Sequence, residues 1–404
     1  MSFATARIGD VLTFQRGFDI TKAEQTDGEI PIVSSSGTSS HHNHWKVAGP
    51  GIVIGRKGTL GTTHFLKSNF WPHDTTLWIK DFKGNDPKFL YYFLQTLHLE
   101  NFDTGSSNPT LNRNHVHKIT VKFPEALEIQ QKIAAILSTY DDLIANNQRR
   151  ITLLERMAED IYREWFVRLR FPGHENTTIE KGVPQGWRFE VASSFFGHVK
   201  GKSYSGDDLS DNPAHMPFIT LKSFNRGGGY RADGLKRYSG PYKPGQVVQP
   251  GDVVMAVTDM TQNREVVGRV ARVPAIGERG AVISLDVIKL VPITMSGSFL
   301  YSYFRLSGFG EYIKEFANGT NVLHLKPDLV TQQRVLMPPP ELQDRFVGLI
   351  EPMYQQIDAI NLAVDELKST RDALLPRLIS GKLSVDALDI RFPPEMTRGL
   401  ESNS

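Results

Sequence analysis

Apolar residues recur with helical spacing along two long stretches of the sequence. From Gln130 and from Gln343, steps of alternately three and four residues meet mostly apolar side chains over five heptads. This stripe contains Ile133, Leu137, Tyr140, Ile144, Asn147, Ile151, Leu154, Ala158, Ile161 and Trp165 in the first stretch, and Phe346, Ile350, Met353, Ile357, Ile360, Val364, Leu367, Arg371, Leu374 and Leu378 in the second. It predicts two long helices, each of which is the obvious coiled-coil partner of the other.

The direction of this pairing follows from what precedes each helix. Each helical stretch comes after a segment of different pattern, so antiparallel helices would hold those segments at opposite ends of a rod. The connector from Arg170 to Gly186 contains several Pro and Gly and leaves room for the chain to turn back. We therefore expect antiparallel packing, with Asn147 fixing the register and Pro352 kinking the second helix near its start.

The segments before the two helices contain short β-type runs, separated by the Gly, Ser, Asn and Pro clusters that mark turns. In the first segment the runs are 11–14, 30–33, 52–54, 75–79 and 119–123, with a helical patch at 87–97. In the second they are 217–221, 253–257, 266–273 and 281–290, with a helical patch at 298–304. Both segments therefore read as mixed α/β globules.

Three short motifs occur twice in the same order. Ile30-Pro31-Ile32-Val33 returns as Met216-Pro217-Phe218-Ile219, and Pro50-Gly51-Ile52-Val53-Ile54 returns as Pro250-Gly251-Asp252-Val253-Val254. Pro124 with Glu128-Ile129-Gln130 returns as Pro338 with Glu341-Leu342-Gln343. Because the copies keep their order while their separation grows, the pattern indicates an internal duplication with loops of different length.

The predicted fold is therefore of the α+β class, with a pseudo-two-fold repeat. Two mixed α/β domains are joined by two long helices that form an antiparallel coiled coil. The expected parts are a first domain at 1–125, a central long helix at 126–170, a linker at 171–185, a second domain at 186–337, a C-terminal long helix at 338–383 and a tail at 384–404.

Composition excludes several classes of protein. The 404 residues contain no cysteine, so a disulfide framework, a thiolate metal site and a cysteine nucleophile are all ruled out. No apolar stretch approaches the ~20 residues of a membrane span, and the start of the chain shows no secretory signal. A cytoplasmic protein is the expectation. Formal net charge is only +2, which permits nucleic-acid binding without requiring it.

The glycine-rich segment from Gly55 to Thr63 follows an apolar run and contains Arg56 and Lys57. It is not a P-loop, because Lys57 precedes its glycine and the residues after Gly61 look extended. A turn that presents Arg56 and Lys57 to phosphates or guanine edges is one interpretation. A solvated hairpin turn is the other.

Two further groups of residues suggest chemistry. His41, His42 and His44 could bind a metal together with residues such as His64 or His73, although no helical His-Glu-x-x-His is present. Asn-rich loops at 105–114 and 318–326 could read adenine, or could equally cap helices and form turns. Candidate DNA-binding residues are Ser35, Ser36, His41, Asn43, Arg56, Lys57, Thr59, Asn108, Asn112, Arg113, Lys222, Arg226, Tyr230, Arg231, Thr258, Asn263, Arg264, Asn321, His324 and Lys326; no metal-binding or catalytic residue is assigned.

Several stretches resemble the specificity (S) subunits of type I DNA restriction-modification enzymes. They are Gly51 to Gly61, Pro124 with Gln130 to Leu137, Trp165-Phe166, and Leu374 to Leu383. The resemblance runs from Gly9 to Leu383 and includes the order globule, helix, globule, helix. It departs at Ala256 to Thr261, which replaces the Gly-Arg-Lys-Gly turn of the first half.

The resemblance implies a non-catalytic subunit in which each domain reads one half of a bipartite DNA target and the helices set the gap. Its partners would be double-stranded DNA, two methyltransferase (M) subunits and two restriction (R) subunits. S-adenosylmethionine, ATP and Mg²⁺ would belong to those partners, in line with the lack of methyltransferase, Rossmann and Walker motifs here. Two alternatives remain: a metal-dependent hydrolase that uses the histidines, and a coiled-coil scaffold without a DNA role.

Overall fold

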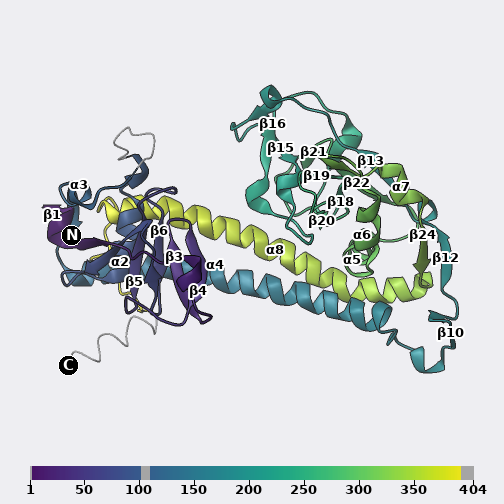
Figure 1. The fold of residues 1–404 in the computed structure, drawn as a ribbon, viewed down its shortest axis with the longest axis horizontal. Helices are drawn as coiled ribbons and strands as arrows, with labels where there is room; N and C mark the ends of the chain where they lie inside the picture. The colour runs from purple at the N-terminus through teal and green to yellow at the C-terminus, as the bar shows by residue number, and fades with distance from the viewer. Residues whose placement is uncertain (1, 102–109, 393–404) are drawn as a thin grey trace. The chain divides into compact units, whose positions relative to one another are not determined.

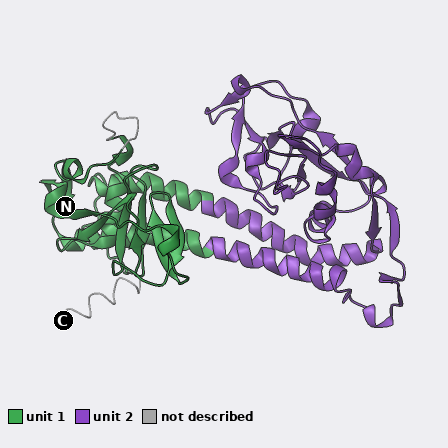
Figure 2. Ribbon diagram, in the orientation of Figure 1, with its two compact units in different colours: residues 1–146, 365–404 green, residues 147–364 purple. Residues whose placement is uncertain are grey.

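The computed structural model describes residues 2–101 and 110–392. The chain divides into two compact units (Figure 2). The first unit contains residues up to 146 and from 365 onward, and the second contains residues 147–364. Two long helices, α4 (Leu127–Tyr162) and α8 (Pro340–Ile379), each contribute to both units. No helix in the described part of the chain is long and apolar enough to cross a membrane.

The first unit contains a four-stranded antiparallel sheet in the order β2-β8-β5-β6 and a three-stranded sheet in the order β4-β3-β7 (Figure 1). The strands are β1 (Phe3–Arg7), β2 (Thr13–Arg16), β3 (Ile30–Ser34), β4 (Gly37–His42), β5 (Gly51–Gly55), β6 (Thr63–Leu66), β7 (Trp71–Pro72), β8 (Thr76–Asp81) and β9 (Thr120–Pro124). The short helices are α1 (Ile8–Val11), α2 (Pro87–Gln95) and α3 (Arg113–Val116). Strand β1 pairs with β9, close to the start of α4.

The second unit contains a four-stranded sheet in the order β13-β22-β18-β20 and a five-stranded sheet in the order β14-β16-β15-β21-β17. The strands are β10 (Ile179–Glu180), β11 (Val183–Pro184), β12 (Arg188–Val191), β13 (Phe196–Lys200), β14 (Leu209–Ser210), β15 (Met216–Ile219), β16 (Lys236–Tyr238), β17 (Val247–Val248), β18 (Val253–Ala256), β19 (Thr258–Asp259), β20 (Val270–Arg272), β21 (Ala281–Ile283), β22 (Val287–Pro292), β23 (Leu323–His324) and β24 (Arg334–Met337). The short helices are α5 (Gly297–Leu306), α6 (Phe309–Ile313) and α7 (Pro327–Gln332).

The four-stranded sheets of the two units have the same strand order, whereas the other sheet has three strands in the first unit and five in the second. Numbered along the chain, each four-stranded sheet has the order first, last, second, third. In each unit the other sheet contains one parallel pair, β3 with β7 and β15 with β21. A separate antiparallel pair precedes each long helix, β1 with β9 and β12 with β24.

Four of the predicted β-type runs differ from the observed strands. The run predicted at 217–221 is a strand only as far as Ile219, because Leu221 begins the turn η7 (Leu221–Ser223). Val11 was placed in a strand, but it ends helix α1, whose first turn is held by the Asp10 carboxylate that accepts the Arg7 amide (3.2 Å). The run predicted at 281–290 is two strands, because the chain turns at Leu285 and passes from one sheet to the other. The run predicted at 266–273 forms a strand only at β20.

The core of the first unit combines both ends of the chain. Helix α2 buries Phe89 and Phe93 against the start of α4, where Ile133 and Leu137 are fully buried. The same cluster contains Leu378 and Ile379 from the end of α8, and Val385 beyond it. The beginning of α4 and the end of α8 therefore share one core.

In the second unit the opposite ends of the same helices meet. Ala158 and Tyr162 near the end of α4 are buried with Phe346 and Ile350 near the start of α8, and Phe299 of α5 joins them. The Tyr162 and Phe346 rings have centroids 5.7 Å apart. Helix α8 continues through Pro352.

Polar contacts also join each unit to its helix segments. In the second unit Arg272 binds Asp358 of α8 (2.8 Å), and Arg305 binds Glu159 of α4 (2.9 Å). In the first unit Asp141 of α4 accepts bonds from the Tyr92 hydroxyl (2.5 Å) and Arg371 (2.7 Å). Arg371, the charged exception in the apolar stripe, thus has an acidic partner.

All residues of the two predicted stripes are buried or half-buried. Asn147 is half-buried and accepts a bond from Arg150 of its own helix (3.3 Å), so its amide oxygen has a local partner. The burial agrees with the helical period, which keeps these positions on one face.

Replacing Leu378 by Ala should destabilise the first unit by about 2–5 kcal/mol, because it removes a fully buried side chain from that core. Denaturant unfolding combined with hydrogen exchange would measure the loss unit by unit. Leu362→Ala is the control, since Leu362 is 51% exposed on the same helix. Equal effects of the two variants on the first unit would contradict the shared core.

Candidate functional site

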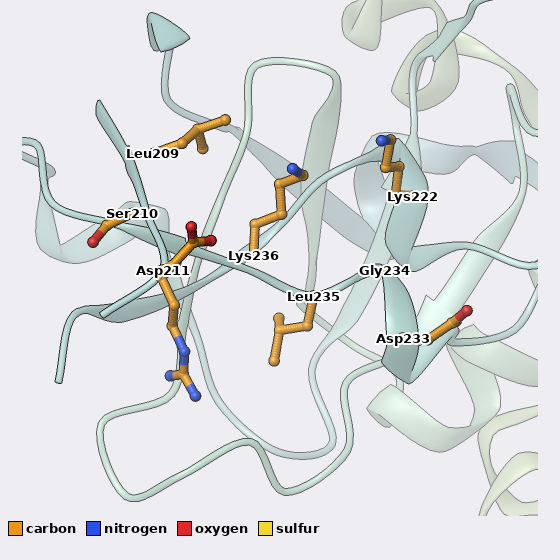
Figure 3. Close-up of a pocket in the computed structure, with 9 residues that line it drawn as sticks. Leu209, Ser210, Asp211, Lys222, Asp233, Gly234, Leu235 and Lys236 are labelled. Atoms are coloured by element: carbon orange, nitrogen blue, oxygen red, sulfur yellow. The ribbon is translucent and has the colours of Figure 1, made fainter. Parts of the chain in front are cut away.

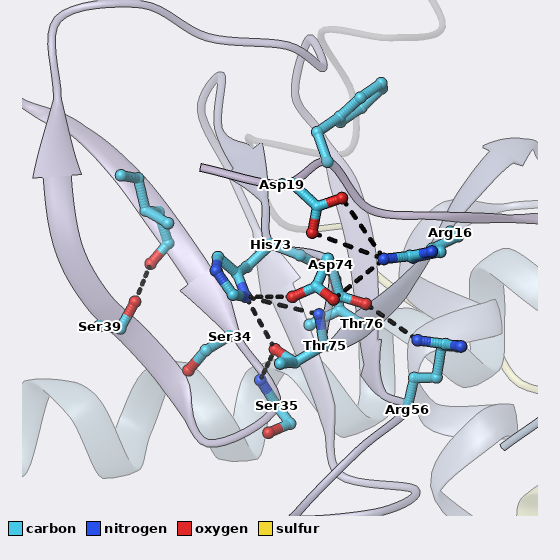
Figure 4. Close-up of polar contacts among 12 residues, drawn as sticks. Arg16, Asp19, Ser34, Ser35, Ser39, Arg56, His73, Asp74, Thr75 and Thr76 are labelled. Carbon is cyan, nitrogen blue, oxygen red and sulfur yellow. Dashed lines mark hydrogen bonds and ion pairs between the residues drawn. The ribbon is translucent and has the colours of Figure 1, made fainter. Parts of the chain in front are cut away.

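In the first unit a polar cluster gathers where several strands of its two sheets end. The β5–β6 hairpin provides Arg56, whose Nη1 donates to the Asp74 carbonyl (3.2 Å) (Figure 4). The Asp74 carboxylate accepts a bond from Arg16 (3.1 Å), and Arg16 also pairs with Asp19 (3.5 Å). Burial, and then the neighbouring Arg16, lower the pKa of Arg56 below its usual value. Arg56 is thus a half-buried guanidinium held in a fixed position.

The backbone holds the same hairpin against the β7–β8 turn. The amides of Arg56 and Lys57 both donate to the carbonyl of Thr75, at 2.8 and 3.0 Å. The side chains of Lys57 and Thr59 are exposed. A glycine is required at Gly61, because its φ is +72° and a Cβ would lie 2.6 Å from the amide nitrogen of Glu100. The loop therefore presents Lys57 from a rigid base.

Ser35 and Ser36 form the tight turn between β3 and β4 next to this hairpin. Ser35 is buried, with its amide 3.4 Å from the Thr75 hydroxyl and its carbonyl accepting from His64 Nε2 at 3.2 Å. Ser36 is exposed. Of the two serines, only Ser36 offers a side chain to an external ligand.

The histidines do not form a common site. His42 is buried, accepts the Thr26 amide on Nδ1 (3.0 Å) and lies edge-on to Trp71. His41 and Asn43, its neighbours, are exposed. Across residues 2–101 and 110–392, no group of three or more His, Cys, Asp or Glu could hold a metal ion. This arrangement does not favour the hydrolase alternative.

The Asn-rich loop of the first unit is described only in part. Asn108 lies outside the described residues. Asn112 is the N-cap of α3, and its side chain accepts the Asn114 amide at 2.9 Å. Arg113 is exposed. At Asn112 the structure therefore favours helix capping over the reading of adenine.

In the second unit two candidates, Thr258 and Arg264, are not free to contact a ligand. Thr258 is buried in β19, 3.3 Å from His324 Nδ1. Arg264 pairs with Glu315. The exposed candidates in this region are Asn263, Asn321, His324 and Lys326.

Asp259, which the sequence analysis missed, organises the loop that follows β19. Its buried carboxylate accepts the Val266 and Val267 amides (2.7 and 3.2 Å) and the amide and hydroxyl of Thr261 (both 2.9 Å). Burial raises its pKa, but these bonds outweigh burial and leave the pKa below the usual value. The Asp-x-Thr pattern of a side-chain turn was the available signal. The loop thereby presents Met260, which is 68% exposed.

The remaining candidates of the second unit lie between β15 and β16. Arg231 forms two bonds to Asp233 (both 2.7 Å), and Arg226 pairs with Glu265 (3.1 Å). Lys222 is exposed. Tyr230 packs on the apolar cluster around Ile219, and burial raises the pKa of its hydroxyl. Tyr230 is therefore a packing residue rather than an open stacking platform.

Known proteins are similar to this chain over most of its length. Residues 2–156 match the family model described as type I restriction modification DNA specificity domain. The type I restriction enzyme MjaIX specificity subunit of Methanocaldococcus jannaschii is 26% identical over 318 residues, which are 74% of this chain and 70% of that protein. The MjaVIII specificity subunit of the same organism is 21% identical over 354 residues, 84% and 77% of the two chains.

A solved structure shares the fold. The crystal structure of the type I restriction-modification S subunit from M. genitalium has a TM-score of 0.61 at 15% identity, and covers 94% of this chain and 96% of that one. This likeness shows the fold, and the family match over residues 2–156 agrees with the resemblance inferred from the sequence.

Replacing Asp259 by Asn should lower the free energy of unfolding by about 1–3 kcal/mol near pH 7, because a buried carboxylate with several bonds loses its charge. The depressed pKa makes this stabilisation present above the ordinary carboxyl pKa and lost as pH falls through the folded-state pKa. The difference between wild type and variant should therefore shrink in acid. Denaturant titrations from pH 7 to 3 would measure it.

Asp207→Asn is the matched control, because Asp207 is an exposed carboxylate of the same unit. Hydrogen exchange at the Val266 and Val267 amides should speed up in the Asp259 variant alone. Unchanged exchange at both amides would show that the carboxylate does not hold the loop.

Proposed function

We propose that this chain, whose residues 2–156 belong to the type I restriction modification DNA specificity domain family, is the DNA-recognition subunit of a type I restriction-modification enzyme. The family match carries the proposal, and the similarity to specificity subunits over most of the chain supports it. The subunit is non-catalytic: it binds DNA and assembles with methyltransferase and restriction subunits, which perform the chemistry.

Each unit reads one half of a bipartite target. The corresponding sheet orders of the two units support an internal duplication, and thus two similar recognition domains. The loops at the sheet ends differ between the units, which suits two different half-sites. The exposed candidates for contact with bases or phosphates are Ser36, His41, Asn43, Lys57, Thr59, Asn112 and Arg113 in the first unit, and Lys222, Arg226, Arg231, Asn263, Asn321, His324 and Lys326 in the second.

The two long helices set the gap between the half-sites. In each unit the end of one helix packs with the opposite end of the other, which supports an antiparallel pair. At ~1.5 Å per residue each helix spans on the order of 55 Å. A stiff pair of this length would hold two readers apart along the duplex.

The same helices dock the methyltransferase subunits, of which we expect two, along with two restriction subunits. Leu153 and Met157 on α4 and Leu349 on α8 are each about half exposed in the second unit. Leu153 and Met157 are four residues apart and so lie on one face of α4, and a contiguous apolar patch is typical of a site that another protein covers. S-adenosylmethionine, ATP and Mg²⁺ would act in those partner subunits.

Co-expression of the chain with its cognate methyltransferase subunits, followed by mapping of methylated bases across the host genome, tests this function. A split motif with a fixed unread gap is the expected result. Methylation of a continuous motif would contradict the two-reader arrangement. No DNA binding and no methylation by the assembled complex would favour the scaffold alternative.

The double variant Arg56→Ala and Lys57→Ala should weaken binding to target DNA, by about 1–3 kcal/mol if one residue contacts guanine. The reason is the loss of two cations from one rigid hairpin. Titration of labelled duplex with the methyltransferase complex would measure it. Lys80→Ala, an exposed lysine on β8, is the control. Equal affinities of all three proteins would exclude this hairpin from the interface.

Removing one heptad from each helix, residues 143–149 and 361–367, should shorten the unread gap by about three base pairs. Each heptad spans ~10 Å at ~1.5 Å per residue, and a base pair spans ~3.4 Å. These segments exclude Asp141 and Asp358, so the polar contacts of both units are retained. Methylation mapping gives the gap directly. A functional variant with an unaltered gap would refute the ruler.

A further inference from the structure

The two units differ most clearly in one hairpin connection. In the first unit β3 and β4 are joined by only Ser35 and Ser36. In the second unit the corresponding strands, β15 and β16, are joined by residues 220–235, which form the short turns η7 (Leu221–Ser223) and η8 (Ala232–Gly234). This excursion adds a surface that the first unit lacks.

The excursion borders an open hollow of about 480 Å³ against β14 and β16 (Figure 3). Its lining consists of Leu209, Ser210, Asp211, Lys222, Asp233, Gly234, Leu235, Lys236 and Arg237. Lys222 and Lys236 both line this hollow, and in Figure 3 their side chains point in a similar direction. Two cationic side chains from different segments therefore share one concave surface.

Gly234 makes this arrangement possible. A Cβ at this position would lie 1.7 Å from the carbonyl oxygen of Lys222, so only glycine allows the two turns to touch. The Ser223 hydroxyl donates to the Gly234 carbonyl (3.3 Å), and the Arg231 amide donates to the Ser223 carbonyl (2.9 Å). The backbone beneath Lys222 is therefore fixed before any ligand arrives.

The charges around the hollow leave the two lysines unneutralised. Asp233 is already bound by Arg231 through two bonds. Within the described part of the chain, neither Lys222 nor Lys236 has an ion-pair partner. Lys236 is half-buried, which limits its contact with water. Arg237 adds a third cation and Asp211 one open carboxylate, so the lining as a whole favours an anion.

We propose that this hollow binds a backbone phosphate of the DNA at the second half-site, through Lys222 and Lys236. The inference rests on the proposed function and adds the position of one phosphate contact in the second unit. An ammonium acts on phosphate as a point charge, without reading base edges. The two lysines therefore strengthen binding and orient the domain, and they leave the target sequence unchanged.

The test uses the full chain assembled with its methyltransferase subunits and a duplex that carries the mapped target. For wild type and for the double variant Lys222→Gln and Lys236→Gln, affinity is measured at several salt concentrations. Each lost phosphate contact reduces the slope of log K against log salt by ~0.9, so the loss of this one contact should lower the slope by about 1. At 0.1 M salt the loss of affinity should be on the order of 10-fold.

Two matched variants complete the experiment. Lys181→Gln with Lys200→Gln removes the same charge from exposed lysines of the second unit outside the hollow, and should keep the wild-type slope. Lys222→Arg with Lys236→Arg keeps the charge and should restore most of the affinity. Thermal unfolding of each complex confirms that the variants are folded.

Four outcomes decide between the phosphate site and its alternatives. A reduced slope with an unchanged methylation motif supports the phosphate site. An unchanged slope overturns it, as does an altered motif, because an altered motif means that the lysines read bases. If the wild-type complex itself binds no DNA, the proposed function fails. If the wild-type complex binds DNA and the variant binds it equally well, only the phosphate site fails.

Discussion

The packing of each long helix against the opposite end of the other is the constraint on which both units depend. Ile133 and Leu137 at the start of α4 are buried with Leu378 near the end of α8, and Tyr162 at the end of α4 is buried with Phe346 near the start of α8. Each core is built from residues of several separate stretches of the chain. A change in helix length or register therefore acts on both globules at once, whereas a change in a surface loop acts on one.

Periodicity predicted the helices well because burial along them follows a strict spacing. Every stripe position is buried or half-buried, and the charged exception Arg371 has Asp141 as its partner. The shorter elements were harder, because a few apolar residues fit either state. Val11 follows this rule: its side chain is buried, but the Asp10 cap makes its segment a helical turn.

In the candidate site, residue type alone does not tell which side chains are available to contact DNA. The sequence suggested Arg56 and Thr258 as readers, yet the Arg56 side chain donates to the Asp74 carbonyl and Thr258 is buried in a strand pair. Contacts between residues far apart in the sequence decide such cases, and no local pattern contains them. Lys236 was missed for the same reason. It is one residue of a short strand until the excursion of residues 220–235 brings Lys222 to the same hollow.

Within each unit the sheets and the loops have different roles. The four-stranded sheets have the same strand order in both units, and in each unit the long helices pack into the core, so these parts fix where the loops lie. The loops carry the differences, and carboxylates such as Asp259 hold them in shape before binding, which reduces the entropy lost on association. The chain as a whole is nearly neutral, so its attraction to a polyanion has to come from local groups of cations. A concave surface with two unneutralised lysines meets that requirement in a way that paired arginines such as Arg231 do not. Phosphate contacts would then position the second unit on the duplex, and the neighbouring exposed loops would be left to read the bases.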